Sequence, residues 1–391
     1  MTQKAIKSKF GRALLIVAAL IGLILISSLI WPSTSYVSGD SDNLTVAVTP
    51  SKPRHLPTPD PLRAVYMTSW VAGTASIREP LINLIDQTEI NAVVIDVKDY
   101  TGIISFTATN TAMSKYGSMS QRILDIEGLI KRLHEKNIYV IARISVFQDS
   151  HLSKTRPDLA VIRASDGEMW RDHKGVSWLD QGSHEVWDYT VMVGKMAEQV
   201  GFDELNFDYI RFPSDGNMQD IAYRFYNSNE QTKPEALESF FKYLDEQLSL
   251  LTIPISADLF GMTTTNNDDL GIGQVWERAL PHFDYLAPMI YPSHYPPTFN
   301  GFANPAEHPY AMIKIAAQGA IDKTVAASST VAKIRPWLQD FSLGADYTAK
   351  MIEAQKQALY DLGINSWMMW DPSNKYTNSA YQLNIATSTA P

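Results

Sequence analysis

The sequence contains no cysteine among its 391 residues. Disulfide bonds, cysteine-ligated metal sites and thiol catalysis are therefore excluded. Positive charge is also scarce, because 33 Lys and Arg residues stand against 42 Asp and Glu residues and leave a net charge of -9. This balance gives no electrostatic reason to expect a nucleic-acid partner. With 45% hydrophobic and 19% charged residues, the composition is still that of a folded protein.

Three common catalytic signatures are missing as well. The eight histidines form no HExxH or similarly spaced metal pair, and no G-x-S-x-G nucleophile elbow occurs. No glycine-rich phosphate loop follows the first strand-like segment, and Gly271 and Gly273 lack the rest of that fingerprint. We therefore expect neither a metal ion nor an organic cofactor.

The N-terminal segment is basic and then apolar. Four basic residues precede an uncharged run over 13–31, which is long enough to cross a bilayer as a helix. The basic flank predicts a cytoplasmic N-terminus. A cleaved signal peptide starts in the same way, but no small-x-small cleavage site directly follows the run. We expect residues 1–31 to anchor the chain in a membrane with the remainder outside the cytoplasm; secretion after cleavage is the alternative.

A change of composition marks the domain boundaries. Residues 32–61 are rich in Ser, Thr, Pro, Asp and Asn, and several closely spaced prolines prevent regular structure there. This stretch is expected to be a disordered linker that tethers the following domain. The folded domain is expected over 62–375, and residues 376–391 are expected to form a C-terminal tail.

From residue 62 onward, short apolar runs alternate with longer amphipathic segments. Strands are predicted at 64–70, 92–98, 139–145, 204–209, 253–259, 285–291 and 364–370, and another before the last near 324–329 or 334–337. Helices are predicted over 79–89, 123–136, 186–200, 234–250 and 345–362. Such alternation implies βαβ units and a parallel sheet. A count near eight, with no phosphate loop, favours an α/β fold of the (β/α)8 TIM-barrel type over an open sheet.

The active sites of such barrels form at the carboxyl ends of the strands. The fourth predicted strand carries Asp208 and the fifth carries Asp258. Because residues two apart on a strand share a face, Asn206 lies beside Asp208 and Ser256 beside Asp258. Two converging carboxylates are what glycosidic cleavage requires, one as proton donor and the other as nucleophile or base. Asp208 and Asp258 are therefore the catalytic candidates.

Other polar and aromatic residues stand at the same predicted strand ends. We expect them to bind the substrate or to tune the carboxylates, and aromatic rings among them to stack on sugars. Each has an ordinary alternative: for Asp208 it is pairing with Arg211 or capping of a helix, and for the tryptophans it is packing at the rim. The candidates are Trp70, Asp96, Asp99, Arg143, Asn206, Arg211, Tyr291, Trp370 and Asp371.

Several of these segments also resemble a known family. The fourth-strand segment 202–213, FDELNFDYIRFP, is similar to the bacterial putative glycosyl hydrolase domain family (DUF4015). The segments 91–99, followed by Gly102, 287–292 and 367–371 resemble the same family. The likeness covers about residues 62–375, and it implies a barrel of the glycoside hydrolase type.

Two more distant likenesses bear on mechanism. The fourth strand is similar to that of family 18 chitinases, in which Asp203 and Asp208 match acidic positions, and Met289 and Tyr291 match a methionine–tyrosine pair of the sixth strand. Ile210 occupies the position of the chitinase's catalytic glutamate, however, and isoleucine donates no proton. The resemblance to alpha-amylase-like barrels implies instead that Asp208 is the nucleophile and Asp258 the acid.

The sequence therefore favours a glycoside hydrolase that acts on an extracytoplasmic polysaccharide or oligosaccharide through paired carboxylates. Two alternatives stay open. The missing glutamate at Ile210 is compatible with a non-catalytic glycan-binding barrel, and a structural protein of the cell envelope would need no converging carboxylates at all.

Overall fold

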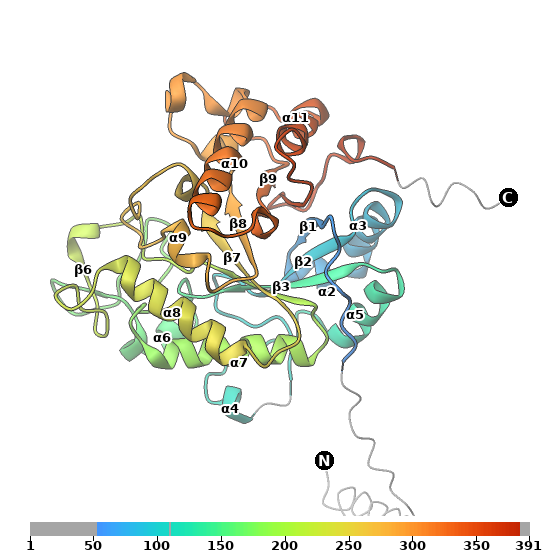
Figure 1. Cartoon of the computed structure of the whole chain (residues 1–391). Coiled ribbons are helices and arrows are strands. Elements are labelled where there is room, and N and C mark those ends of the chain that lie inside the picture. The colour runs from blue at the N-terminus through green and yellow to red at the C-terminus, as the bar shows by residue number, and fades with distance from the viewer. Residues whose placement is uncertain (1–52, 109–110, 384–391) are drawn as a thin grey trace, which may run out of the picture. The chain divides into compact units, whose positions relative to one another are not determined.

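The computed structural model describes residues 53–108 and 111–383 (Figure 1). The expected membrane anchor over 1–31 and most of the expected linker lie outside these residues. Within the part of the chain that the structure describes, no helix is both long and apolar enough to cross a membrane.

Eight parallel strands close into a barrel, which confirms the predicted fold. Each strand pairs with its neighbours along the chain, and the last pairs with the first. The short pair β4 (Ile162–Arg163) and β6 (Ile221–Ala222) lies outside the barrel. The barrel strands are β1 (Arg63–Met67), β2 (Ala92–Lys98), β3 (Tyr139–Ser145), β5 (Glu204–Asp208), β7 (Ile255–Phe260), β8 (Tyr285–Met289), β9 (Trp337–Gln339) and β10 (Trp367–Trp370).

Helices surround the barrel (Figure 1). The longer ones are α3 (Ala75–Gln87), α5 (Ile126–Glu135), α7 (His184–Gln199), α8 (Lys233–Leu248), α10 (Pro309–Ala326) and α11 (Ala349–Tyr360). Single turns occur at α2 (Ser69–Gly73), α4 (Thr111–Ser114), α6 (Leu152–Thr155) and α9 (Trp276–Ala279). One apolar core fills the space between strands and helices.

Local sequence explains where α8 begins. Thr232 caps the helix, and its hydroxyl and the Glu235 side chain form a reciprocal capping box. Pro234 stands in the first turn, where its missing N–H costs nothing. Apolar residues recur along one side and are buried, among them Leu237, Phe240 and Leu244.

The seventh barrel strand is β9, and the prediction of a strand at 324–329 is wrong. Residues 324–326 end helix α10 instead. β9 has only three residues, and its pairing with β8 consists of Met289 opposite Trp337 and a separate bridge between Leu286 and Ile334. So short a strand has too few residues to show an alternating pattern.

Alternate strand residues point into the barrel and form a second, separate core. Tyr66, Ile141, Ala287 and Met368 belong to it. On β5 and β7 the corresponding inward positions are polar instead, with Glu204, Asn206, Asp208, Ser256 and Asp258 all buried. The barrel interior is therefore continuously polar along β5 and β7 and largely apolar along the other strands.

Both ends of the described chain pack on the barrel. The N–H of Leu56 donates to Asp203 at 2.7 Å, and the hydroxyl of Thr58 lies 3.1 Å from that of Tyr139. Near the other end, Tyr376 donates to the carbonyl of Tyr66 at 2.6 Å. Leu56 and Thr58, before residue 62, and Tyr376, after residue 375, are thus hydrogen-bonded to residues of the barrel.

Candidate active site

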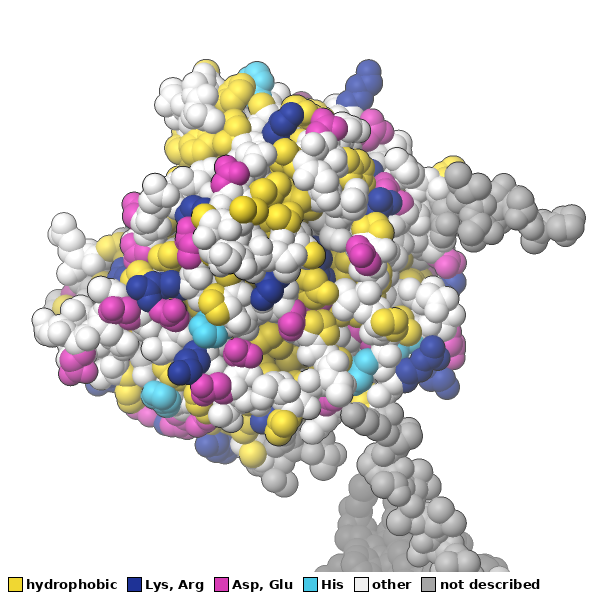
Figure 2. Space-filling view, in the orientation of Figure 1, with side chains coloured by type: hydrophobic (Ala, Val, Ile, Leu, Met, Phe, Trp, Pro, Cys, Tyr) yellow, Lys and Arg dark blue, Asp and Glu magenta, His cyan; other side chains and the backbone are white. Residues whose placement is uncertain are grey.

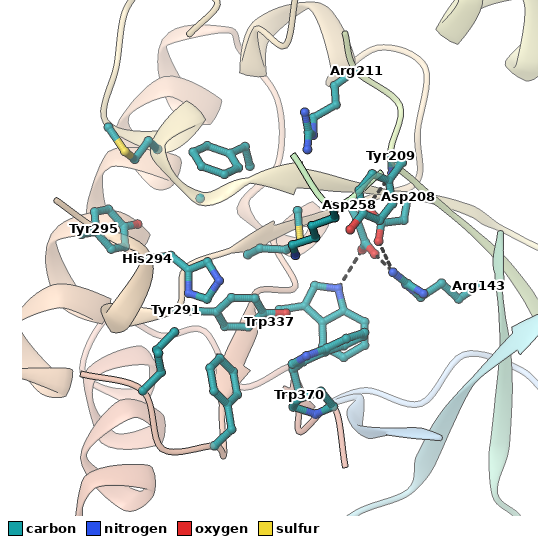
Figure 3. Close-up of a pocket in the computed structure, with 18 of the residues that line it drawn as sticks. Arg143, Asp208, Tyr209, Arg211, Asp258, Tyr291, His294, Tyr295, Trp337 and Trp370 are labelled. Carbon is teal, nitrogen blue, oxygen red and sulfur yellow. Dashed lines mark hydrogen bonds and ion pairs between the residues drawn. The ribbon is translucent and has the colours of Figure 1, made fainter. Parts of the chain in front are cut away.

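A cavity of about 540 Å³ lies at the carboxyl ends of the strands (Figure 3). Its lining comes from six strands, β3, β5, β7, β8, β9 and β10, and from the loops that follow them. Six of the residues selected from the sequence line it: Arg143, Asp208, Arg211, Asp258, Tyr291 and Trp370.

Asp208 ends β5 and is held by two donors. Its Oδ2 forms a short ion pair with Nη2 of Arg143, and its Oδ1 accepts the N–H of Tyr209 at 2.5 Å. Tyr209 has a φ of 53°, a left-handed conformation that is unfavourable for a tyrosine. This turn directs the backbone N–H of Tyr209 back toward Asp208. A guanidinium and an amide N–H thus bind the two oxygens of the Asp208 carboxyl group.

Asp258 stands on the neighbouring strand β7 in a different environment. Only 1% of the residue is exposed, and its Oδ1 accepts hydrogen bonds from Nε1 of Trp337 at 2.7 Å and from Nδ2 of Asn206 at 2.9 Å. Burial, and secondarily the negative charge of Asp208, raise the pKa of Asp258 to about 8. Asp258 is therefore mostly protonated at neutral pH. Because both donors point at Oδ1, the proton belongs on Oδ2.

Arg143 connects the two carboxyl groups. Its Nε lies 3.8 Å from Oδ2 of Asp258, and its Nη1 donates to Asp96 at 2.6 Å. Burial acts to lower the pKa of Arg143, but Asp208 and Asp96 outweigh it and raise that pKa well above its ordinary value. One fixed cation thus lies among three carboxyl groups, Asp96, Asp208 and Asp258.

Aromatic rings border this group. Tyr66 stacks on Trp370 with the ring centroids 3.9 Å apart, and the guanidinium carbon of Arg143 lies 5.0 Å from the centroid of Trp370. Trp337 meets Trp370 edge to face at 5.6 Å. On the other side of the cavity, Tyr291 packs against His294, and burial lowers the pKa of that histidine (Figure 3).

The chain matches a family of known proteins, and the match agrees with this geometry. Residues 64–376 match the family model described as "Putative glycosyl hydrolase domain", DUF4015. The chain belongs to this family. The match confirms the resemblance noted in the sequence and supports a hydrolase that acts on glycosidic bonds.

Solved structures are similar to this member of the glycosyl hydrolase domain family. A hypothetical protein from Ruminiclostridium thermocellum is 32% identical over 53% of this chain and 98% of its own, with a TM-score of 0.45. The PgaB (BpsB) glycoside hydrolase domain from Bordetella bronchiseptica is 13% identical over 79% of this chain and 94% of its own, with a TM-score of 0.57. The α-galactosidase TtGalA from Thermus thermophilus is 13% identical over 86% and 62%, with a TM-score of 0.50. The last two likenesses concern the fold. No significant match is found among curated proteins.

Two predicted site residues of this family member lie just behind the cavity lining. Asp96 is buried, pairs with Arg143 and accepts a short hydrogen bond from the hydroxyl of Tyr66. Asn206 donates to Asp258 and to the hydroxyl of Ser256. Both residues position the ionisable groups and do not line the cavity themselves.

Three other predicted residues are not brought into the cavity. Trp70 is 62% exposed and lies against the guanidinium of Arg122. Asp99 forms an ion pair with the same Arg122 at 2.7 Å. Asp371 accepts hydrogen bonds from the backbone and hydroxyl of Ser373, so it stabilises the turn after β10.

The contacts of Asp208 and the burial of Ile210 distinguish the alternative roles of the fourth strand. Asp208 pairs with Arg143, and no contact within 4.0 Å joins it to Arg211 in the described residues. Ile210, at the position of the chitinase glutamate, is fully buried in the core between strands and helices. The described segment that includes β5 and the residues just after it therefore presents no glutamate to the cavity at the position of the chitinase acid, as the sequence indicates.

Other residues of the cavity were not selected from the sequence. Trp337 is the one that the sequence could most easily have indicated, because it stands in one of the two segments predicted for the seventh strand. Phe260 ends β7. Most of the others come from loops whose path the sequence does not specify, among them Lys174, Met262, His294, Tyr295, Phe341 and Leu343. Within the described residues, no group of three His, Asp or Glu side chains could hold a metal ion.

Proposed function

We propose that this protein is a glycoside hydrolase in which Asp258 is the proton donor and Asp208 its charged partner. One observation carries the proposal: two carboxyl groups line one cavity, and their environments differ. Asp208 faces a guanidinium and an amide, whereas burial raises the pKa of Asp258 to about 8. Carboxyl pairs whose environments separate their pKa values are how enzymes obtain an acid and a base at one pH.

The chemistry follows from these contacts. Oδ2 of Asp258 gives its proton to the glycosidic oxygen as that bond breaks, and the sugar develops positive charge at its anomeric carbon. The Asp208 carboxylate stabilises this charge, and it either attacks that carbon or takes the proton of an attacking water. Arg143 remains charged throughout. Its positive charge stabilises the Asp208 carboxylate before the proton is transferred and the Asp258 carboxylate after it.

The remaining cavity residues are proposed to hold the sugar. Tyr291 and Trp370 offer ring surface, and Arg143 and Arg211 offer hydrogen-bond donors. The substrate we propose is an extracytoplasmic polysaccharide or oligosaccharide, reached by a domain held at the membrane. The basic, apolar N-terminal segment and the proline-rich stretch after it support that location.

The test is the release of new reducing ends from a panel of purified bacterial polysaccharides. Asp208→Asn keeps the shape of the side chain but removes its charge, so we expect turnover to fall on the order of 1,000-fold or more while the circular dichroism spectrum is unchanged. Asp322→Asn, on the exposed surface of α10, serves as the matched control and should retain full activity. Equal turnover of Asp208→Asn and wild type would reject the assignment.

One observation favours a second candidate, a non-catalytic glycan-binding barrel. Asp208 and Asp258 are only 4% and 1% exposed, and Asp208 is already paired with Arg143. In a binder these groups would only shape the cavity. Saturable glycan binding, without release of reducing ends from any bound glycan, would favour this candidate over hydrolysis.

A further inference from the structure

We infer that the sugar bound next to Asp208 carries an anionic group, a carboxylate or a phosphate, which Arg211 and Lys174 bind. This inference rests on the proposed function for the location of the sugar, but it concerns the class of substrate. It is carried by the arrangement of charges around the cavity.

Arg211 is the central observation. It follows Asp208 by three residues and lines the same cavity (Figure 3). Its guanidinium carbon lies 4.9 Å from the ring centroid of Trp178 and 5.5 Å from that of Tyr209, so aromatic faces hold it in place. Its Nη1 donates to the carbonyl of Phe212 at 3.0 Å and to the hydroxyl of Ser214 at 3.1 Å.

What Arg211 lacks is a carboxylate partner. Among residues 53–108 and 111–383, no carboxylate oxygen lies within 4.0 Å of its nitrogens, and the same holds for the ammonium group of Lys174. By contrast, Arg143 in the same cavity pairs with Asp96 and Asp208. A guanidinium that is held in place, partly desolvated and without an anion is a ready partner for a planar carboxylate or a phosphate.

The sum of charges points the same way. The cavity is lined by three cations, Arg143, Arg211 and Lys174, and by two carboxyl groups, Asp208 and Asp258. Burial raises the pKa of Asp258 to about 8, so that group is mostly neutral at pH 7. Asp208 and, behind the lining, Asp96 both pair with Arg143, which leaves Arg211 and Lys174 as the lining cations without a carboxylate within 4.0 Å in the described residues. The whole chain has a net charge of -9.

The cations are therefore a local feature of the cavity. On the face drawn in Figure 2, Lys and Arg side chains are interspersed with Asp and Glu. A surface with both signs of charge mixed in this way is not expected to attract polyanions in general. A neutral sugar would leave Arg211 without an anion after burial, which is unfavourable. An acidic sugar would supply the anion that this guanidinium lacks.

The test uses small probes with no glycosidic bond, so that binding is measured apart from hydrolysis. D-glucuronate, D-glucose and inorganic phosphate are titrated into the purified protein at low salt, and tryptophan fluorescence is followed because Trp337 and Trp370 line the cavity. For ligands of this size a Kd on the order of 1 mM is expected. We expect saturable binding of glucuronate at least about tenfold tighter than of glucose, weakened by added salt.

Substitutions locate the anion. Arg211→Gln should weaken glucuronate binding about tenfold or more, whereas Arg211→Lys should recover part of the affinity. Lys174→Gln, at an exposed residue that can change without loss of the fold, should weaken it about two- to threefold. Lys131→Gln, on the exposed side of α5, removes the same charge outside the cavity and should have no effect.

The outcomes separate the two proposals. If phosphate and not glucuronate binds in an Arg211-dependent way, the anion is a phosphate and the inference stands. Equal binding of glucuronate and glucose, no saturable binding of either anion, or identical affinities in Arg211→Gln and wild type would overturn it. Arg211-dependent anion binding, in a protein that cleaves no acidic or neutral glycan, would uphold this inference and reject hydrolysis.

Discussion

Two buried arginines inside the same barrel have opposite surroundings. Arg335 lies toward the amino ends of the strands, where its Nη1 and Nη2 both contact Oε2 of Glu204 at 3.0 and 3.1 Å. Tyr139 and Ser256 donate to the same glutamate, so one cation meets one satisfied carboxylate. Arg143 lies toward the carboxyl ends and faces three carboxyl groups, one of which has its pKa raised to about 8.

This difference suggests that the two arginines have different roles: Arg335 stabilises the fold, and Arg143 belongs to the candidate active site. A matched and enclosed ion pair leaves no group ready to exchange a proton. Around Arg143 the carboxyl groups outnumber the cation, and burial raises the pKa of Asp258, which lines the cavity; under the proposed function, this is the proton that a substrate receives. The comparison predicts that changes at the Arg335 pair alter the free energy of unfolding, whereas changes around Arg143 alter turnover.

The largest effect is expected at the enclosed pair. Arg335→Met leaves Glu204 charged and buried without its partner, which should lower the free energy of unfolding by about 3–5 kcal/mol. Chemical denaturation measures this loss. The double variant Arg335→Met with Glu204→Gln removes both charges and should recover part of it. A double variant as unstable as the single one would contradict a charge-based explanation.

The next effect is expected on turnover. Asp258→Asn retains the oxygen that accepts from Trp337 and Asn206 but cannot donate an acidic proton, so kcat should fall on the order of 100- to 1,000-fold. Thermal unfolding near pH 4, where Asp258 keeps its proton in the folded protein, should show little change, in contrast to Arg335→Met. A glycoside with a good leaving group, such as a nitrophenyl glycoside, should be affected much less, because its departure needs little protonation.

Stability should depend on pH through the same residue. The pKa of Asp258 is raised from an ordinary 3.8 to about 8, so the folded protein binds a proton that the unfolded chain releases between these values. Its contribution to the free energy of unfolding is therefore complete below pH 4 and decreases by up to about 1.4 kcal/mol per pH unit until pH 8. Denaturation of wild type and Asp258→Asn across this range measures the difference, and parallel curves would contradict the assignment.

The smallest effect concerns one hydrogen bond. The indole N–H of Trp337 donates to Asp258 at 2.7 Å and so favours the ionised carboxylate. Trp337→Phe removes this donor and should raise the pKa of Asp258 further, by less than about one unit. The alkaline limb of the pH–rate profile should then move upward. A downward movement would mean that Trp337 does not act on Asp258 in this way.

Much of the fold could be predicted from local sequence. The predicted limits 92–98 and 139–145 are those of β2 and β3, because buried parallel strands are continuous apolar runs between polar turns. Helix α10 was not predicted, and the alternative segment 334–337 meets strand β9 only at Trp337. α10 is apolar on most sides, which obscures the helical period, and β9 is held by its neighbours more than by its own three residues.

The candidate site was predictable to the extent that its residues lie on strands. Asp208 and Asp258 follow from the two-residue period and from the rule that barrel sites form at strand ends. The pairing of Asp208 with Arg143 and not with Arg211 depends on adjacent strands β3 and β5, whose relative register is a property of the closed barrel. Lys174 lies in the long loop between β3 and α7, and no local pattern indicates that this loop returns over the cavity.

The contacts of residues 56 and 58 have a practical consequence. Leu56 and Thr58 are fixed beside Asp203 and Tyr139, which stand just before or at the start of their strands, whereas the cavity opens at the other ends. A protein captured on a sensor chip or bead through a tag that directly precedes residue 53 is thus joined at the end opposite the cavity. Immobilisation by that route should leave a long glycan chain free to enter, and assays on solid supports can be arranged accordingly.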